Sequence, residues 1–151
     1  MVRVIESILV GTDGSGTAAI AVAHAIEVAR GLHARLQIVS AYEPVPEGRL
    51  RQEALPARSD VQWTVNPRAD VLALLESAQR DAEAAGIAPV ETFARVGDAA
   101  DAILDVAEEQ HCHLIVVGNK GMTGATRFLL GSVPNKVSHH APCSVLIVRT
   151  S

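Results

Sequence analysis

Short apolar runs alternate along the chain with segments in which apolar residues recur at helical spacing. A strand buried on both faces of a parallel sheet is continuously apolar, whereas a helix that covers the sheet carries one apolar stripe. The alternation therefore predicts β–α–β units and a parallel sheet. Five runs are expected to be strands: Ile8–Val10, Leu36–Tyr42, Val90–Val96, Leu114–Val117 and Val145–Val148.

Four helices are expected between and beside these strands, and residues typical of helix ends mark them. Ser15 and Gly31 flank the first helix, and Asn66-Pro67 and Gly86 flank the second. Asp98 precedes the third helix, and the fourth is expected from about Ser132 to His140. The run Val90–Val96 alternates apolar with polar residues, which predicts a half-exposed strand at the edge of the sheet.

The chain of 151 residues is long enough for one domain with a substantial core. Residues 43–67 are rich in Pro, Arg and Glu and show no sustained periodicity, so this long connection is expected to be functional or mobile. We find no internal repeat. Residues 1–151 are therefore expected to form a single α/β domain with a long variable connection at 43–67.

Composition excludes several classes of protein. Two cysteines are too few for a stapled secreted module, and no stretch approaches the roughly 20 apolar residues that span a bilayer. We expect a cytoplasmic protein without a signal peptide or a membrane partner. Only 3% of the residues are aromatic, so the stacking platform of a single-stranded nucleic-acid binder is missing.

Charge is unevenly distributed along the chain. Residues 1–113 hold all 17 acidic residues and nine basic ones, a net charge of −8, whereas residues 114–151 have a net charge of +4 and no acid. The overall charge of −4 therefore hides a basic C-terminal quarter, formed by Lys120, Arg127, Lys136 and Arg149.

Two glycine-rich segments follow predicted strands. The first, Gly11-Thr12-Asp13-Gly14-Ser15-Gly16, has the wrong glycine order for a dinucleotide fingerprint, and the chain contains no P-loop motif. A tight turn alone would explain these glycines. Asp13, however, stands at the carboxyl end of a strand, where a carboxylate can accept hydrogen bonds from ribose hydroxyls, and the two interpretations remain open.

The second segment places Gly118, Gly121, Gly131 and Ser132 in the pattern G-x2-G-x9-G-S, between a buried strand and a helix. Glycines let the backbone come close to a ligand, and the N–H groups that open the following helix attract phosphate. Ser132 adds a hydroxyl donor. Lys120 and Arg127 could place positive charge over a polyphosphate, although each alone also fits a solvated loop.

Other chemistry is weakly supported. The segment His111-Cys112-His113, with His139, His140 and Cys143, could converge at the amino edge of the sheet as a zinc site, but the spacing is not that of a zinc finger. We therefore expect no metal held by protein side chains. No ordered set of Ser, His and acid is present, so no catalytic residue is assigned and an enzyme is the weaker class.

The glycine pattern at 118–132, the opening Ile8-Leu9-Val10-Gly11-Thr12-Asp13-Gly14-Ser15 and the closing Cys143-Ser144-Val145-Leu146-Ile147-Val148-Arg149 together resemble the universal stress protein family. The resemblance implies an open five-stranded parallel sheet of order 3-2-1-4-5 with helices on both faces, a Rossmann-like fold of the adenine nucleotide alpha hydrolase type. It also implies a homodimer through the last strand, Val145 to Arg149. The connection 43–67 is long enough to cover that edge instead.

The same resemblance places the chain in the branch of the family that binds ATP through this glycine pattern. By position, Asp13 would hold the ribose, and Gly11, Thr12, Ala41 and Val117 would surround the adenine. The residues around ribose and phosphates would be Gly118, Gly121, Gly131, Ser132 and Val133, with Lys120 and Arg127 near the phosphates. Mg²⁺ would be held chiefly by the phosphates and water.

The expected function is therefore binding of an adenine nucleotide in a stress-response or signalling role. ATP is the first choice. Some family members similar to this chain around Gly-Asn-x-Gly and Gly-Ser-Val-Pro favour cyclic AMP, so a cyclic AMP-binding protein is one alternative. A slow ATP-hydrolysing enzyme is the other, because Asp13, Ser15 and Ser132 stand near the expected phosphates.

Overall fold

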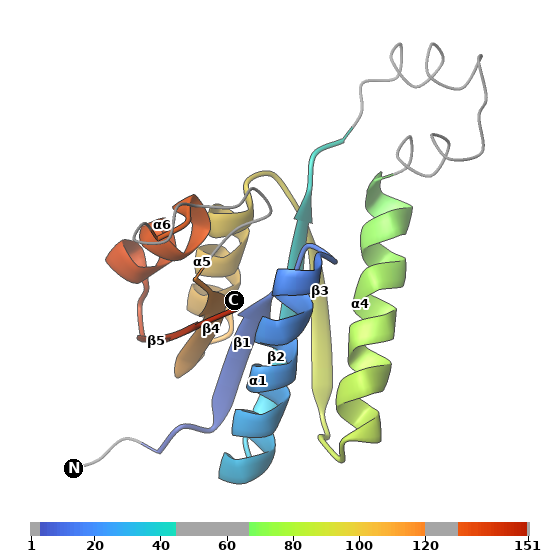
Figure 1. The fold of residues 1–151 in the computed structure, drawn as a ribbon, viewed down its shortest axis with the longest axis vertical. Coiled ribbons are helices and arrows are strands. Elements are labelled where there is room, and N and C mark those ends of the chain that lie inside the picture. Colours follow the sequence, from blue (N-terminus) through green and yellow to red (C-terminus); the bar gives the residue numbers. More distant parts are fainter. Residues whose placement is uncertain (1–3, 45–66, 120–129, 151) are drawn as a thin grey trace.

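A computed structural model describes residues 4–44, 67–119 and 130–150. Its centre is a five-stranded, all-parallel sheet of strand order β3-β2-β1-β4-β5, as the resemblance implied (Figure 1). The strands are β1 (Ser7–Gly11), β2 (Arg35–Tyr42), β3 (Val90–Val96), β4 (Leu114–Gly118) and β5 (Ser144–Val148). The helices of the described residues are α1 (Gly16–Leu32), α4 (Pro67–Ala84), α5 (Ala99–Glu109) and α6 (Ser132–His140).

Helices cover both faces of the sheet. Helices α1 and α4 pack on one face, and α5 and α6 pack on the other (Figure 1). Successive side chains of a strand point to opposite faces, so Ile8 and Val10 of β1 join the core under α1 and α4, whereas Leu9 joins the core under α5. Burial on both sides explains why β1 and β4 are continuously apolar.

The edge strands differ from the central ones, as their sequences predicted. Strand β3 lies at one edge, with most of its side chains half-buried or exposed. Strand β5 lies at the other edge, and its Leu146 and Ile147 side chains are each 38% exposed. The continuously apolar strands β1 and β4 are thus central, and the alternating strand Val90–Val96 is an edge strand.

The predicted N-caps Ser15 and Asp98 are confirmed, whereas the predicted end of α1 is not. Ser15 accepts a hydrogen bond from the Ala18 N–H at 3.2 Å, and Asp98 accepts one from the Asp101 N–H at 3.1 Å. Helix α1 does not stop at Gly31 but continues to Leu32. The left-handed turn that ends it falls on His33, with φ of 53°, whose N–H bonds back to the last turn of the helix.

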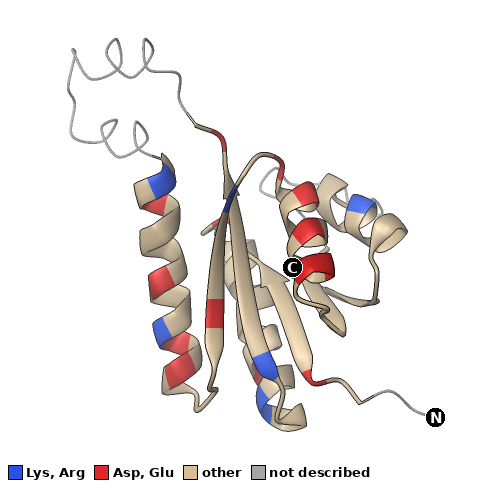
Figure 2. Cartoon of the chain, turned by 180° about the vertical axis from the view of Figure 1, so that it is seen from behind, with Lys and Arg blue, Asp and Glu red and all other residues tan. Residues whose placement is uncertain are grey.

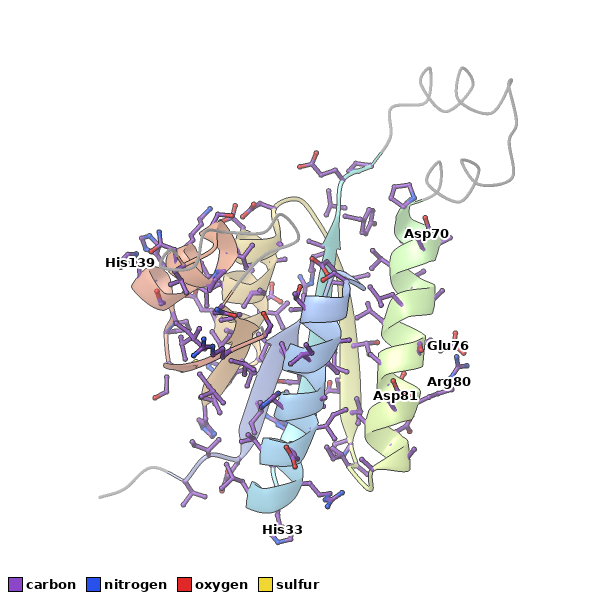
Figure 3. The ribbon with its side chains drawn as sticks, viewed as in Figure 1. His33, Asp70, Glu76, Arg80, Asp81 and His139 are labelled. Carbon is purple, nitrogen blue, oxygen red and sulfur yellow. The ribbon has the colours of Figure 1, made fainter. Side chains whose placement is uncertain are left out.

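The outer faces of the helices carry most of the charge. Glu76 and Arg80 point toward one another on the solvent side of α4, 3.2 Å apart, and His33 lies at the C-terminal end of α1 (Figure 3). An exposed pair at this spacing contributes only a few tenths of a kcal/mol. None of the helices in the described ranges is long and apolar enough to span a membrane.

A buried polar cluster lies near the amino end of the central strands. The Gln37 side chain is fully buried, and its Oε1 accepts hydrogen bonds from Ser7 Oγ at 3.0 Å and Cys112 Sγ at 2.9 Å. Burial raises the pKa of the Cys112 thiol. Burial also raises the pKa of Cys143 to about 11, with a smaller contribution from the neighbouring Cys112. Both cysteines are therefore neutral thiols near pH 7.

We predict that Cys143 makes the fold sensitive to alkali. The unfolded chain releases this proton near the ordinary pKa of 9.0 and the folded chain only near 11, so the free energy of unfolding falls as the pH rises through that interval. The test is to measure the free energy of unfolding in urea, for the wild type and for Cys143→Ala, between about pH 8 and pH 10.5. The variant should lose less stability with rising pH. Parallel curves for the two proteins would contradict the prediction.

Candidate functional site

A pocket opens at the carboxyl ends of the central strands. In an open parallel sheet, ligands bind beyond the carboxyl ends of two neighbouring strands whose following connections run to opposite sides of the sheet. Here the chain passes from β1 outward to β2 and later returns to β4 on the other side of β1. The pocket at this point has a volume of about 580 Å³, a figure that includes space open to solvent.

The floor of the pocket is apolar. Val39 and Val117 come from the strands on either side of β1, and Ala102 and Ile103 come from α5 behind the sheet. A Cβ atom built on Gly11 would lie 2.6 Å from Ile103 Cδ1. The missing side chain at Gly11 therefore makes room for Ile103. A flat apolar group fits such a floor better than a charged one.

The turn between β1 and α1 forms one rim. The Thr12 N–H donates to the Val39 carbonyl at 3.0 Å, which ties the turn to β2. Asp13 is exposed, and its Oδ1 accepts a hydrogen bond from the Ser15 N–H at 2.8 Å. Gly14 takes a left-handed conformation, with φ of 83°, so the turn needs glycine there. These contacts fix the Asp13 carboxylate at the mouth of the pocket.

Three helices begin at the pocket, and their N-terminal ends attract negative charge. Ser15 and Thr17 line it at the start of α1, Ala99 at the start of α5, and Val133 at the start of α6. The first two helices are capped by Ser15 and Asp98. The N-cap of α6 is Gly131, which has no side chain for this purpose. The N–H groups in the first turn of α6 are therefore the best placed to receive an anion.

Lys136 holds α6 against α5. Its Nζ lies 2.7 Å from Asp101 Oδ1 and 3.6 Å from Asp98 Oδ2. The hydrogen bond to Asp101 raises the pKa of Lys136. Figure 2 shows acidic residues along α5 and a basic residue on the neighbouring α6. The positive charge of Lys136 is therefore paired with acidic residues of α5. Among the described residues that line the pocket, Asp13 is the one charged residue.

Most of the predicted binding residues that the structure describes line the pocket: Gly11, Thr12, Asp13, Ala41, Val117, Gly118 and Val133. Gly131 and Ser132 stand at the start of α6, next to the lining residue Val133. Lys120, Gly121 and Arg127 lie outside the described residues, as does Asn66.

Sequence reasoning missed pocket residues supplied by α1 and α5. Ala99, Ala102 and Ile103 of α5 lie under the pocket, although their sequence is that of an ordinary amphipathic helix. Ala18 and Ala21 of α1 were missed for the same reason. No residue type identifies these positions as pocket residues, so only the packing of α5 behind β1 and β2 reveals the part that this helix plays.

The histidines and cysteines considered for zinc have other surroundings. Cys112 Sγ donates a hydrogen bond to Gln37 Oε1, and His113 Nδ1 accepts a hydrogen bond from the Glu6 N–H at 3.0 Å. His139 and His140 pack edge to face at the end of α6, with ring centroids 6.5 Å apart. Within the three described ranges, no group of three or more His, Cys, Asp or Glu side chains is placed to hold a metal ion.

This strand order, with helices on both faces and a pocket at the carboxyl edge, defines a doubly wound α/β protein. The sequence model of the Universal stress protein family matches residues 5–149. The chain belongs to the universal stress protein family.

Known relatives cover nearly the whole chain. Universal stress protein Rv1636 of Mycobacterium tuberculosis is 38% identical over 146 residues, which are 97% of each chain. A crystal structure of a universal stress protein in complex with cAMP has a TM-score of 0.74 and 36% identity, and covers 99% of this chain and 100% of that one. UspA from Lactobacillus plantarum shares the fold, with a TM-score of 0.79 at 22% identity over 97% of this chain and 99% of its own.

We predict that Gly11 and Ile103 depend on each other. In Gly11→Ala the new methyl group meets Ile103 Cδ1 at 2.6 Å, so the variant should lose about 1–3 kcal/mol of unfolding free energy. Ile103→Val removes that Cδ1 atom and alone should cost about 0.5–1.5 kcal/mol. The double variant should lose less than the sum of the two. Urea unfolding of all four proteins measures this coupling, and strict additivity would refute the contact.

Proposed function

We propose that this protein binds an adenine nucleotide, with ATP as the first choice, in the pocket at the carboxyl edge of the sheet. The observation that carries the proposal is the combination, in one pocket, of an apolar floor, a fixed rim carboxylate and the uncapped start of α6. These three features match the three parts of a nucleotide: a flat base, a sugar with hydroxyl groups, and phosphate.

Each part of the nucleotide has a place in this proposal. The base lies over Val39 and Val117, with Ala41 at its edge. The Asp13 carboxylate accepts hydrogen bonds from the ribose hydroxyls. The phosphates extend toward the first turn of α6, where Gly131 leaves room and Ser132 adds a hydroxyl donor. Asp13 is the one carboxylate among the described lining residues, so Mg²⁺ would be held mainly by phosphate oxygens and water.

Cyclic AMP is the second candidate, and one observation favours it. A universal stress protein of 36% identity forms a complex with cAMP. The single free hydroxyl of its ribose is still available to Asp13.

The first test is identification of the ligand. Nucleotide extracted from the heat-denatured protein is identified, and thermal unfolding is then followed with ATP, AMP and cAMP, each with and without Mg²⁺. At about one hundred times its Kd, the true ligand should raise Tm by about 5–10 °C. If none raises Tm at millimolar concentration, the proposal fails. Phosphate released over hours in excess of protein, and abolished by Asp13→Ala, would make the protein an ATP-hydrolysing enzyme instead.

We further predict that Gly131→Val weakens nucleotide binding about tenfold or more without unfolding the protein. The φ of Gly131 is −61°, which valine adopts readily, so the substitution does not strain the backbone. We expect the added side chain to occupy space that the phosphates need. Gly121→Val should behave alike. Gly31→Val is the matched control, because a Cβ at Gly31 meets nothing within 4 Å. Calorimetric titration measures the affinities. A variant at 131 that unfolds would show that this glycine serves the turn alone.

We also propose a homodimer that forms through β5. Strand β5 pairs only with β4 among the described strands, and its partly exposed Leu146 and Ile147 flank an open backbone edge. Such an edge is a template for pairing with a second copy about a twofold axis. We also propose a stress-response or signalling role, which membership of the universal stress protein family supports, and a cytoplasmic location, which the low cysteine content supports.

The dimer is tested with a charge on the edge strand. Ile147→Lys should shift the protein to a monomer in sedimentation experiments, because lysine on an edge strand blocks pairing with another sheet. Leu72→Lys on α4 is the control, since Leu72 is an equally apolar and exposed residue, at 45% exposure, far from β5 in sequence and in the sheet order. A wild-type monomer at high concentration, or an unchanged dimer in the Ile147 variant, would overturn the proposal.

A further inference from the structure

Asn119, the residue after β4, joins three segments of the chain. Its N–H donates to the Val148 carbonyl at 2.8 Å, and its own carbonyl accepts from the Gly131 N–H at 3.0 Å. Its side-chain Oδ1 accepts two hydrogen bonds from Thr150, one from the N–H at 2.9 Å and one from Oγ1 at 3.0 Å. A backbone N–H can only donate, so the amide oxygen must face Thr150.

These bonds connect the two sites proposed above. Gly131 is the N-cap of α6, so the Asn119 carbonyl fixes the start of the helix expected to receive phosphate. Val148 is the last residue of β5, the strand expected to form the dimer edge, and Thr150 follows it. Gly118, the residue before Asn119, lines the pocket.

The connections are partly shielded from water. Val148 is 5% exposed and Thr150 is 8% exposed, while Asn119 itself is half-buried. Leaving a buried donor without a partner costs more than one such hydrogen bond contributes. Thr150 therefore depends on the Asn119 side chain for both of its donors, and a shift of β5 is transmitted to Asn119.

We propose that Asn119 is the positioning residue that couples the nucleotide pocket to the β5 edge. This inference rests on the proposed function, since it requires that the pocket binds a nucleotide and that β5 pairs with a second copy. A ligand at the start of α6 holds Gly131 and Asn119 in place, and Asn119 then holds the end of β5. Pairing of β5 fixes the same residues from the other side. Ligand binding and dimerisation therefore strengthen each other by the same factor.

Three proteins test the coupling: the wild type, Asn119→Asp and Asn119→Leu. Aspartate keeps an oxygen acceptor for both Thr150 donors, whereas leucine has a similar size and no acceptor. The dimer dissociation constant is measured by sedimentation without nucleotide and with a saturating amount of ATP, and in parallel with cAMP. The coupling factor is the ratio of the two constants, so a uniform change in affinity or stability does not alter it.

The wild type and Asn119→Asp should show a coupling factor of about 5 to 150, the usual range for coupled sites. In Asn119→Leu the factor should fall several-fold, because both side-chain hydrogen bonds to Thr150 are lost. The backbone bonds of residue 119 to Val148 and Gly131 remain, so nucleotide still binds and dimers still form. Thr150→Val removes only the hydroxyl donor and should give an intermediate coupling factor. If Asn119→Leu does not fold, Thr150→Val still tests the inference. A wild-type factor of one, or an unchanged factor in both Asn119→Leu and Thr150→Val, overturns the inference.

Failure of the proposed function gives a different result from failure of the coupling. If the wild type binds neither nucleotide, the proposed function is refuted and the coupling with it. If it stays monomeric at every concentration, the proposed dimer is refuted and the coupling with it. If the wild type binds nucleotide and dimerises with a factor of one, the proposed function stands and only the coupling is refuted.

Discussion

The parallel pairing of β1 with β4 is the constraint on which the rest of this structure depends. It places residues Ile8 to Val10 beside Leu114 to Val116, although more than one hundred residues separate them in the chain. Because crossovers between parallel strands are right-handed, a chain that first builds outward through β2 and β3 and then returns to β4 must place its later helices on the opposite face. The two faces with their separate cores, and the crevice above β1, follow from that reversal.

The pocket in this crevice is defined by small residues and by helix ends as much as by functional groups. Gly11 has no side chain because Ile103 occupies the adjoining space, and α6 starts with Gly131 and no capping side chain. Asp13 is held by a hydrogen bond within its own turn before any ligand arrives. Such preorganisation lowers the entropy lost on binding. The described part of the pocket therefore orients a ligand with few ordered polar groups.

Much of the fold could be read from the sequence, because each strand and helix carries its own period and its own end signals. The strands at Val90–Val96 and Leu114–Val117 differ in pattern because one lies at an edge and the other in the centre. The pocket was harder to predict. Asp13 and Gly118 were found because strand ends meet at one edge of a parallel sheet, whereas Ala99, Ala102 and Ile103 belong to a helix whose sequence shows only that one face is buried. Likewise, the sequence places Lys136 in a basic quarter, but only the packing of α6 on α5 shows that Asp98 and Asp101 neutralise it.

The contribution of α5 to the pocket floor has a consequence for the divergence of ligand preference. Ala102 and Ile103 line the pocket, yet neither belongs to the glycine-rich segments. Substitutions on this helix can therefore enlarge or reduce the floor while the turn after β1 and the start of α6 remain unchanged. Two proteins with identical glycine patterns can in this way accept ligands of different size, and a chemically enlarged nucleotide could be matched to a variant of α5 as a selective probe.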